Sequence, residues 1–354
     1  MKKLILAIES SCDETAAALV DAHGSVIGSE LVSQISTHNL YGGVVPEVAS
    51  RAHFEEIDAV VRTLVQKSGI DPLRDLEAVA ATMGPGLIGP LLVGVSYARG
   101  IAVAWKKPFV GVHHLRGHLA SALLEKDPTR SMRDQLRELS PALVLLASGG
   151  HTQLLLLEET FSATSLADTA DDAAGECFDK SAKLMGLPYP GGPAIEKLAR
   201  ESSGGERAKA FASELPKPKS AAGFSFSGLK TAIRLKLSQN PALQRDADFC
   251  WAIEDTIAQV FERALKATYG DLKHEGRAPR TLVLCGGVSA NLKLRSLFER
   301  FAEGRKMQVL LPPLRYCTDN AAMIAGAAWL QSDEQNLVDV QARIPMEISR
   351  GASR

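Results

Sequence analysis

One succession of elements occurs twice along this chain of 354 residues. The first copy predicts two short strands around a polar turn at 9–15, then a third strand, and later a strand that leads through a glycine-rich loop at 83–89 into a helix. The second copy has its polar turn at 148–152 and its strand, loop and helix at 281–300. This period is far too long for a solenoid. The pattern predicts an α/β fold of two related halves with a cleft between them.

Chain length favours the same division, because 354 residues exceed what one hydrophobic core usually supports. We expect an N-terminal α/β half at 1–112, completed by a C-terminal helix at about 320–335. The second half is expected at 113–319, with inserted helices and a basic loop at 201–227. The lysines of that loop either contact nucleic acid or lie in solvent, and the sequence leaves both interpretations open.

Charge and cysteine usage narrow the class of protein. The 40 basic and 41 acidic residues give a net charge of −1, so any nucleic-acid binding must rest on a local patch or on a partner. The five cysteines are widely spaced and form no C-x-x-C pair, which favours reduced thiols and argues against a zinc ribbon. No uninterrupted apolar run is long enough to span a bilayer. We therefore expect a cytoplasmic protein without a membrane partner.

Two histidines stand four residues apart where a predicted strand gives way to a predicted helix. On a helix, His114 and His118 project from one face and can share a metal ion. The alternative is a capping or core histidine, which the pair alone does not exclude. The H-E-x-x-H pattern of zinc proteases is not met, because Leu115 stands where the general-base glutamate belongs. Peptide hydrolysis by that mechanism is therefore disfavoured.

The two polar turns occupy equivalent positions in the repeated unit. Glycine-rich turns and helix N-termini hold phosphate through backbone N–H groups. Either turn by itself is compatible with a plain hairpin. Their occurrence in both copies favours phosphate binding.

Nine motifs between Leu4 and about residue 330 together resemble one known family, the bacterial TsaD proteins, which are tRNA threonylcarbamoyladenosine transferases. They lie at 7–15, 114–118, 148–152, 172–176, 178–180, 189–193, 224–231, 286–291 and 317–320. Motifs this numerous and in this order make coincidence untenable. The tail after Leu330 carries no recognisable signature.

The resemblance implies an RNase H-like fold of the actin, Hsp70 and sugar-kinase type, in agreement with the duplicated halves. It also implies transfer of a threonylcarbamoyl group from threonylcarbamoyl-AMP to N6 of adenosine 37, in tRNAs that read codons beginning with A. The implied partners are a TsaB-like paralogous subunit and a TsaE-like P-loop ATPase. The implied cofactor is one divalent metal ion per subunit, iron or alternatively zinc, held by His114, His118 and Asp319.

Residues for the nucleotide and acyl group follow from the resemblance and from the glycine loops. They are Leu146, Ala147, Ser148, Gly149, Gly150, His151, Asp179, Gly192, Glu196, Gly287 and Asn291. Two positions depart from the family pattern: Glu196, where many relatives have aspartate, and Arg116, where glutamate is common. Asp13 or Glu14 is a candidate proton acceptor, with a solvated turn carboxylate as the alternative.

Three other classes of protein fit parts of the sequence. A small-molecule kinase or ATPase of the same fold would use the cleft without the histidines. A metalloprotease would need a general base beside the metal. A non-catalytic paralogue would keep the fold and lose the metal ligands, whereas this chain has all three.

Overall fold

The computed structural model describes residues 3–41, 43–217 and 223–343. The chain divides into two compact units. Unit 1 comprises Met1–Ser140, Leu157–Thr164 and Pro312–Arg354, and unit 2 comprises Pro141–Leu156 and Ser165–Leu311. The division after Ser140 differs from the expected boundary at 112, and the histidine motif therefore belongs to unit 1.

Unit 1 is built on a five-stranded sheet in the order β3-β2-β1-β4-β5. β1 to β3 form the expected antiparallel meander, and β4 and β5 extend the sheet in parallel with β1. β1 is buried on both faces and reads as a continuous apolar run, as central strands do. The strands are β1 (Leu4–Glu9), β2 (Glu14–Asp21), β3 (Val26–Ser33), β4 (Leu76–Gly84) and β5 (Phe109–His113).

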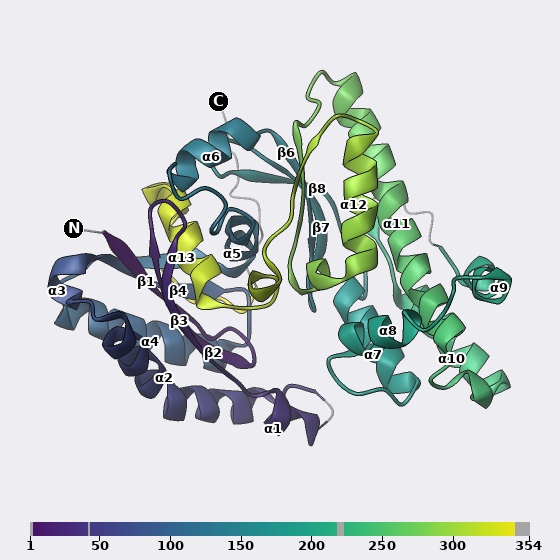
Figure 1. The fold of residues 1–354 in the computed structure, drawn as a ribbon. Coiled ribbons are helices and arrows are strands. Elements are labelled where there is room, and N and C mark those ends of the chain that lie inside the picture. The colour runs from purple at the N-terminus through teal and green to yellow at the C-terminus, as the bar shows by residue number, and fades with distance from the viewer. Residues whose placement is uncertain (1–2, 42, 218–222, 344–354) are drawn as a thin grey trace. The chain divides into compact units, whose positions relative to one another are not determined.

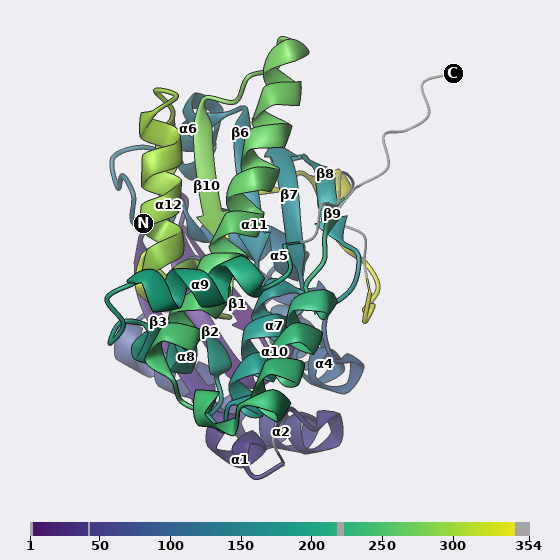
Figure 2. The same cartoon turned by 90° about the vertical axis from the view of Figure 1, so that its right-hand side faces the viewer.

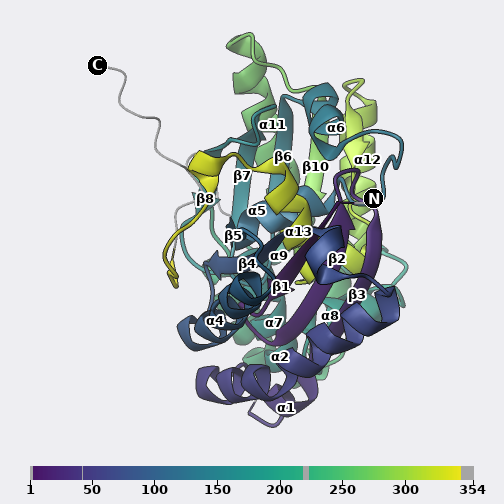
Figure 3. The ribbon, with the colours of Figure 1, turned by 90° about the vertical axis from the view of Figure 1, so that its left-hand side faces the viewer.

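Helices cover both faces of this sheet (Figures 1 and 3). Leu4, Leu6 and Ile8 of β1 share one core with Ile57 of α2 and Val95 of α4. On the opposite side, α13 packs against β1, β2 and α5. α13 is apolar all round, which is expected of a fully buried helix. The helices are α1 (Ile35–Asn39), α2 (Pro46–Ser68), α3 (Pro72–Asp75), α4 (Ile88–Ala104), α5 (His114–Ser121), α6 (Met132–Leu139) and α13 (Ala321–Leu330).

Unit 2 contains a six-stranded sheet in the order β11-β10-β6-β7-β8-β9. The predicted strand, glycine loop and helix are confirmed as β10, a short 3₁₀ turn and α12, and β10 runs parallel to β6. The strands are β6 (Ala142–Ala147), β7 (Thr152–Leu157), β8 (Ala163–Thr169), β9 (Gly223–Phe224), β10 (Thr281–Cys285) and β11 (Gln308–Leu310).

The long helix α11 runs in front of the strands of unit 2 in Figure 2. α11 contacts α8, α9 and α12, and its apolar face fills the core of the unit. The helices are α7 (Ala174–Leu184), α8 (Gly191–Ala199), α9 (Glu206–Glu214), α10 (Ser227–Gln239), α11 (Ala247–His274) and α12 (Leu292–Glu303).

The expected basic loop at 201–227 is only partly a loop, because residues 206–214 form α9. Lys219 lies outside the described residues. Four basic side chains of this region and of α10 are bonded within the chain: Arg207 to Asp246 and Asp248, Lys217 to the carbonyl of Ala212, Lys230 to Asp172, and Lys236 to Glu214. Four of the basic side chains that motivated a nucleic-acid contact here are thus bonded within the protein.

Within the described residues, no helix combines the length and the hydropathy needed to cross a membrane.

Candidate functional site

The helix α5 presents the two histidines as the spacing predicts. It starts at His114, directly after β5, and the side chain of His113 caps it by accepting a hydrogen bond from the Leu115 N–H. All eight residues of α5 are buried. The rings of His114 and His118 lie edge to face with centroids 4.9 Å apart, so the two imidazoles share one face of the helix.

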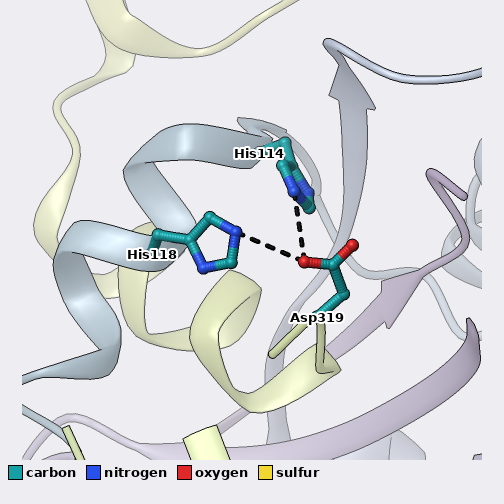
Figure 4. Close-up of side chains that lie close together, drawn as sticks. All are labelled: His114, His118 and Asp319. Carbon is teal, nitrogen blue, oxygen red and sulfur yellow. Dashed lines mark ion pairs between the residues drawn. The ribbon is translucent and has the colours of Figure 1, made fainter. Parts of the chain in front are cut away.

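Asp319 reaches the histidines because α13 packs closely on α5. Asn320 caps α13 by accepting a hydrogen bond from the Met323 N–H at 2.9 Å, which fixes the chain just before the helix. The Asp319 carboxylate oxygen Oδ1 lies 3.4 Å from Nε2 of His114 and 3.3 Å from Nε2 of His118 (Figure 4). Three side chains from two distant segments of unit 1 thus converge on one point.

This group fits a divalent metal ion. Its three ligand atoms lie within 4.8 Å of one another. Nitrogen and oxygen ligands bound ~2.1 Å from one cation are separated by about 3.0–3.4 Å, which matches the spacing to Asp319. His118 is 0% exposed, and neither of its ring nitrogens has a hydrogen-bond partner among the described residues. Buried polar atoms without partners are destabilising, and a cation at Nε2 would satisfy one of them.

Glu9 orients one of the candidate ligands, and the sequence did not assign it a role in the site. Its carboxylate accepts hydrogen bonds from the Ser11 N–H and the Thr82 hydroxyl, both at 2.6 Å, and lies 3.2 Å from Nδ1 of His114. A carboxylate partner favours a proton on Nδ1, which would leave the lone pair of Nε2 for a bound cation. Burial raises the pKa of Glu9, but the neighbouring His114 outweighs burial and lowers it. The sequence feature that could have pointed to Glu9 is its place as a carboxylate at the end of an otherwise apolar strand.

We expect Glu9→Gln to lower metal affinity by about 10- to 100-fold without unfolding the protein, because an amide cannot accept every bond that the carboxylate accepts. Metal titration of the purified protein measures this. Thr82→Val is the matched control, since it removes a bond to Glu9 without touching His114. Equal affinity in Glu9→Gln and wild type would contradict the orienting role.

Gly117 lies where α5 packs on α13 and leaves room for two side chains of α13. A Cβ at this position would lie 2.7 Å from Cδ1 of Ile324 and 3.0 Å from Cγ of Met323. We therefore expect Gly117→Val to push the helices apart, separate His118 from Asp319 and reduce bound metal several-fold. Elemental analysis together with thermal unfolding tests this. Gly100→Val, on α4 with no described atom within 4 Å of a Cβ, is the control, and full metal occupancy in Gly117→Val would contradict the explanation.

The acidic turn between β1 and β2 is held rigidly by its carbonyl groups. The Ser11 carbonyl accepts from the Leu87 N–H, the Cys12 carbonyl from Nε2 of His53, and the Asp13 carbonyl from the Gln34 N–H, at 2.8, 3.1 and 2.9 Å. The Ser11 N–H is bonded to Glu9 and is not available to a phosphate. Phosphate binding by the backbone of this turn would therefore have to use N–H groups other than that of Ser11.

Asp13 and Glu14 differ in their surroundings. Asp13 is buried, and its Oδ2 atom has no hydrogen-bond partner among the described residues. Burial, followed by the charges of Asp319 and Asp13, raises the pKa of Glu14 to about 10. A metal cation beside these carboxylates would act in the opposite direction. The role of either residue as a base stays a prediction.

The glycines of unit 2 fall into two classes. Gly175, Gly191 and Gly286 pack against backbone: a Cβ on Gly175 would lie 2.5 Å from the Ser148 carbonyl oxygen, and one on Gly286 would collide with the Ala147 carbonyl oxygen. Gly286 also has φ +88, which favours glycine. A Cβ on Gly149, Gly150 or Gly287 would meet no described atom within 4 Å, and one on Gly192 only Cβ of Phe178, at 4.0 Å. The expected ligand-contacting glycines thus border open space.

The other expected nucleotide residues are partly engaged within unit 2. The side chains of Leu146 and Ala147 are buried in β6, which leaves only their backbone to meet a ligand. Ser148 and His151 close the turn through a backbone hydrogen bond of 2.8 Å. Three polar side chains make internal bonds: Asp179 to the Gly191 N–H, Glu196 to the Leu292 N–H and Arg200, and Asn291 to Glu254 and the Leu294 N–H.

Comparison with known proteins decides the family. The family model of TsaD, described as tRNA N6-adenosine threonylcarbamoyltransferase, matches residues 25–326. The chain belongs to the TsaD family. The TsaD chain is 43% identical over 348 residues to a tRNA N6-adenosine threonylcarbamoyltransferase from Erythrobacter litoralis. The aligned residues cover 96% of the chain and 94% of the relative. Another from Polaromonas sp. is 45% identical over 337 residues, covering 93% and 91%.

Solved structures confirm the predicted fold class for the TsaD chain. Full-length HypF in its phosphate- and nucleotide-bound form aligns with a TM-score of 0.55 at 15% identity, covering 93% of this chain and 46% of HypF. HypF of T. kodakarensis aligns with a TM-score of 0.52 at 13% identity, covering 93% and 48%. At this identity the likeness shows the fold alone, the α/β fold shared with actin, Hsp70 and sugar kinases.

The family fixes the reaction class of the TsaD chain. It is an acyltransferase that places a threonylcarbamoyl group on N6 of an adenosine in tRNA. The TsaD family is metal-dependent in general, in accord with the histidine and aspartate group of unit 1. No finding favours the kinase, ATPase or metalloprotease alternatives.

Proposed function

We propose that the chain takes the threonylcarbamoyl group from threonylcarbamoyl-AMP and transfers it to adenosine 37 of tRNAs that read codons beginning with A, with one metal ion at His114, His118 and Asp319. The observation that carries this proposal is the group of two buried imidazoles and one partly exposed carboxylate, in which His118 lacks any other partner among the described residues. Iron is the metal that we favour and zinc is the alternative, since imidazole and carboxylate ligands suit both.

A divalent ion in this site would supply a Lewis acid that polarises a carbonyl or phosphoryl oxygen. Two imidazoles and one carboxylate leave coordination positions open, which is the arrangement typical of catalytic rather than structural sites. The role of Glu9 is to keep the proton of His114 on Nδ1 and the lone pair on Nε2.

In unit 2, the turn at Ser148–Gly150 and the loop that contains Gly287 would hold the AMP part of the donor. The open space beside Gly149, Gly150 and Gly287 lets a phosphate or a purine approach the backbone closely. Interactions of this kind also stabilise AMP as the leaving group, because its negative charge grows as the bond to the acyl carbon breaks.

The transfer forms a bond between N6 of the adenosine and the carbamoyl carbon, and breaks the bond between that carbon and the phosphate oxygen. The electron pair leaves with AMP, and the amine loses one proton. Asp13 is our candidate acceptor for that proton, because its buried Oδ2 atom has no other partner among the described residues. Glu14, next to it on the same turn, is the second candidate.

Binding of tRNA by this chain alone should be weak, given its net charge of −1 and the internal ion pairs of Arg207, Lys230 and Lys236. We therefore propose that a TsaB-like paralogue and a TsaE-like P-loop ATPase act with it in the cytoplasm. A direct test uses labelled threonylcarbamoyl-AMP and two tRNA transcripts that differ only at position 37. We expect label in the transcript with adenosine 37 and none in the transcript with guanosine 37, and equal labelling would contradict the proposed acceptor.

A further inference from the structure

Glu254 is a buried carboxylate of unit 2 that bonds to Asn291, directly after the glycine loop, and it has no assigned role in ligand binding so far. Glu254 stands on α11 and is 5% exposed. Its Oε1 atom accepts a hydrogen bond of 2.6 Å from Nδ2 of Asn291. Burial raises the pKa of Glu254, as expected of a carboxylate taken from water into a protein core. A group in this position is retained only where it makes specific bonds.

The orientation of the Asn291 amide is fixed by a second contact. The Leu294 N–H can only donate, and it bonds to the Asn291 side chain at 3.0 Å, so the oxygen Oδ1 must face it. The nitrogen Nδ2 then faces Glu254, which accepts one of its two N–H groups. Asn291 therefore caps α12 and bonds to Glu254, and the hydrogen bonds of the described residues use only one of its two amide N–H groups.

A lysine near Glu254 balances the charge of the carboxylate, but it does not bond to Asn291 in place of Glu254. The Nζ atom of Lys293 lies 3.8 Å from Glu254 and 3.2 Å from Asp255. The same ammonium group lies 3.7 Å from the centroid of the Trp251 ring. Lys293 thus faces two carboxylates and one aromatic ring, whereas only Glu254 of the two carboxylates touches Asn291.

We propose that Glu254 is a positioning residue of the nucleotide site, which locks the Asn291 amide so that its remaining N–H meets an acceptor atom on the adenosine part of the donor. This inference rests on the proposed placement of AMP beside Gly287. A locked donor loses little conformational entropy on binding, and it discriminates acceptor atoms from donor atoms on the ligand.

The test is calorimetric titration of the purified full chain with AMP. Glu254→Ala should raise the Kd for AMP by at least tenfold, because the Asn291 amide then loses one of the two contacts that hold it. Glu254→Gln should recover most of the affinity, since its side-chain oxygen can still accept from Asn291. Asp255→Asn is the matched control: it removes the other carboxylate beside Lys293, and we expect less than a threefold change in Kd.

A merely structural role would give a different pattern. If Glu254 acts through Asn291, Asn291→Ala should weaken AMP binding, and adding Glu254→Ala to it should change the Kd no further. Fully additive losses, or equal losses in Glu254→Gln, Glu254→Ala and Asp255→Asn, would overturn the proposal. So would wild-type affinity in Glu254→Ala. Failure of the wild-type chain to bind AMP would also overturn it, whereas the tRNA labelling assay tests the proposed transfer independently of that result.

Discussion

His118→Ala should lose its bound metal and with it the transfer activity, while the protein remains folded. The variant removes one of three ligand atoms that lie within 4.8 Å of one another, so the remaining pair cannot hold a cation tightly. Lewis-acid assistance amounts to several kcal/mol of barrier, so we expect the rate of threonylcarbamoyl transfer to fall by about a thousandfold or more. Elemental analysis gives the metal content, and tRNA labelling gives the rate.

His38→Ala is a suitable control for this variant. His38 is another buried histidine of unit 1, with hydrogen bonds to Gln34 and to the Val45 N–H, and it is not part of the candidate metal group. It should lose some stability and keep its metal. Stoichiometric metal in His118→Ala, with a circular dichroism spectrum like that of wild type, would show that the ion binds elsewhere.

Gly287→Val should abolish measurable AMP binding and leave the metal content unchanged. A Cβ at Gly287 meets no described atom within 4 Å, so the protein can accommodate the larger side chain and the ligand cannot. We expect the Kd for AMP to rise by 100-fold or more. The metal should persist because all its candidate ligands belong to unit 1, whereas Gly287 belongs to unit 2.

Two neighbouring comparisons sharpen this prediction. Gly270→Val on α11 also places a side chain in open space, and it should bind AMP as wild type does. Gly286→Val should instead disturb the loop itself, because Gly286 has φ +88 and its Cβ would collide with the Ala147 carbonyl oxygen. Wild-type affinity for AMP in Gly287→Val would mean that the adenosine binds at another loop.

Elements with strong periodicity were predictable from the sequence. The meander of β1 to β3, the strand, loop and helix at β4–α4 and β10–α12, and the shared face of His114 and His118 all follow from residue patterns. Asp319 was different: nothing in its neighbourhood predicts a ligand, and only the family resemblance pointed to it. The structure supplies the physical reason, because α13 packs closely on α5 and this packing brings Asp319 to the histidines.

Side-chain bonds between distant segments could not be predicted from the sequence. The pairing of Glu9 with His114 joins positions 105 residues apart, and neither position carries a signal for the other. The sequence likewise predicted a charged, exposed loop, whereas Arg207 forms ion pairs with Asp246 and Asp248, at the N-cap and in the first turn of α11. The two classes of glycine in unit 2 also look identical as sequence, since only packing separates Gly286 from Gly287.

Nucleoside analysis of unmodified tRNA tests the central claim most directly. The wild-type chain and its His118→Ala variant are each incubated with threonylcarbamoyl-AMP, an iron salt and the two proposed partner proteins. We predict threonylcarbamoyladenosine in the digest from wild type, in amounts that depend on added metal, and almost none from the variant. Absence of the modified nucleoside with metal-loaded wild type, or equal amounts from both proteins, would contradict a transfer that depends on the metal at His114, His118 and Asp319.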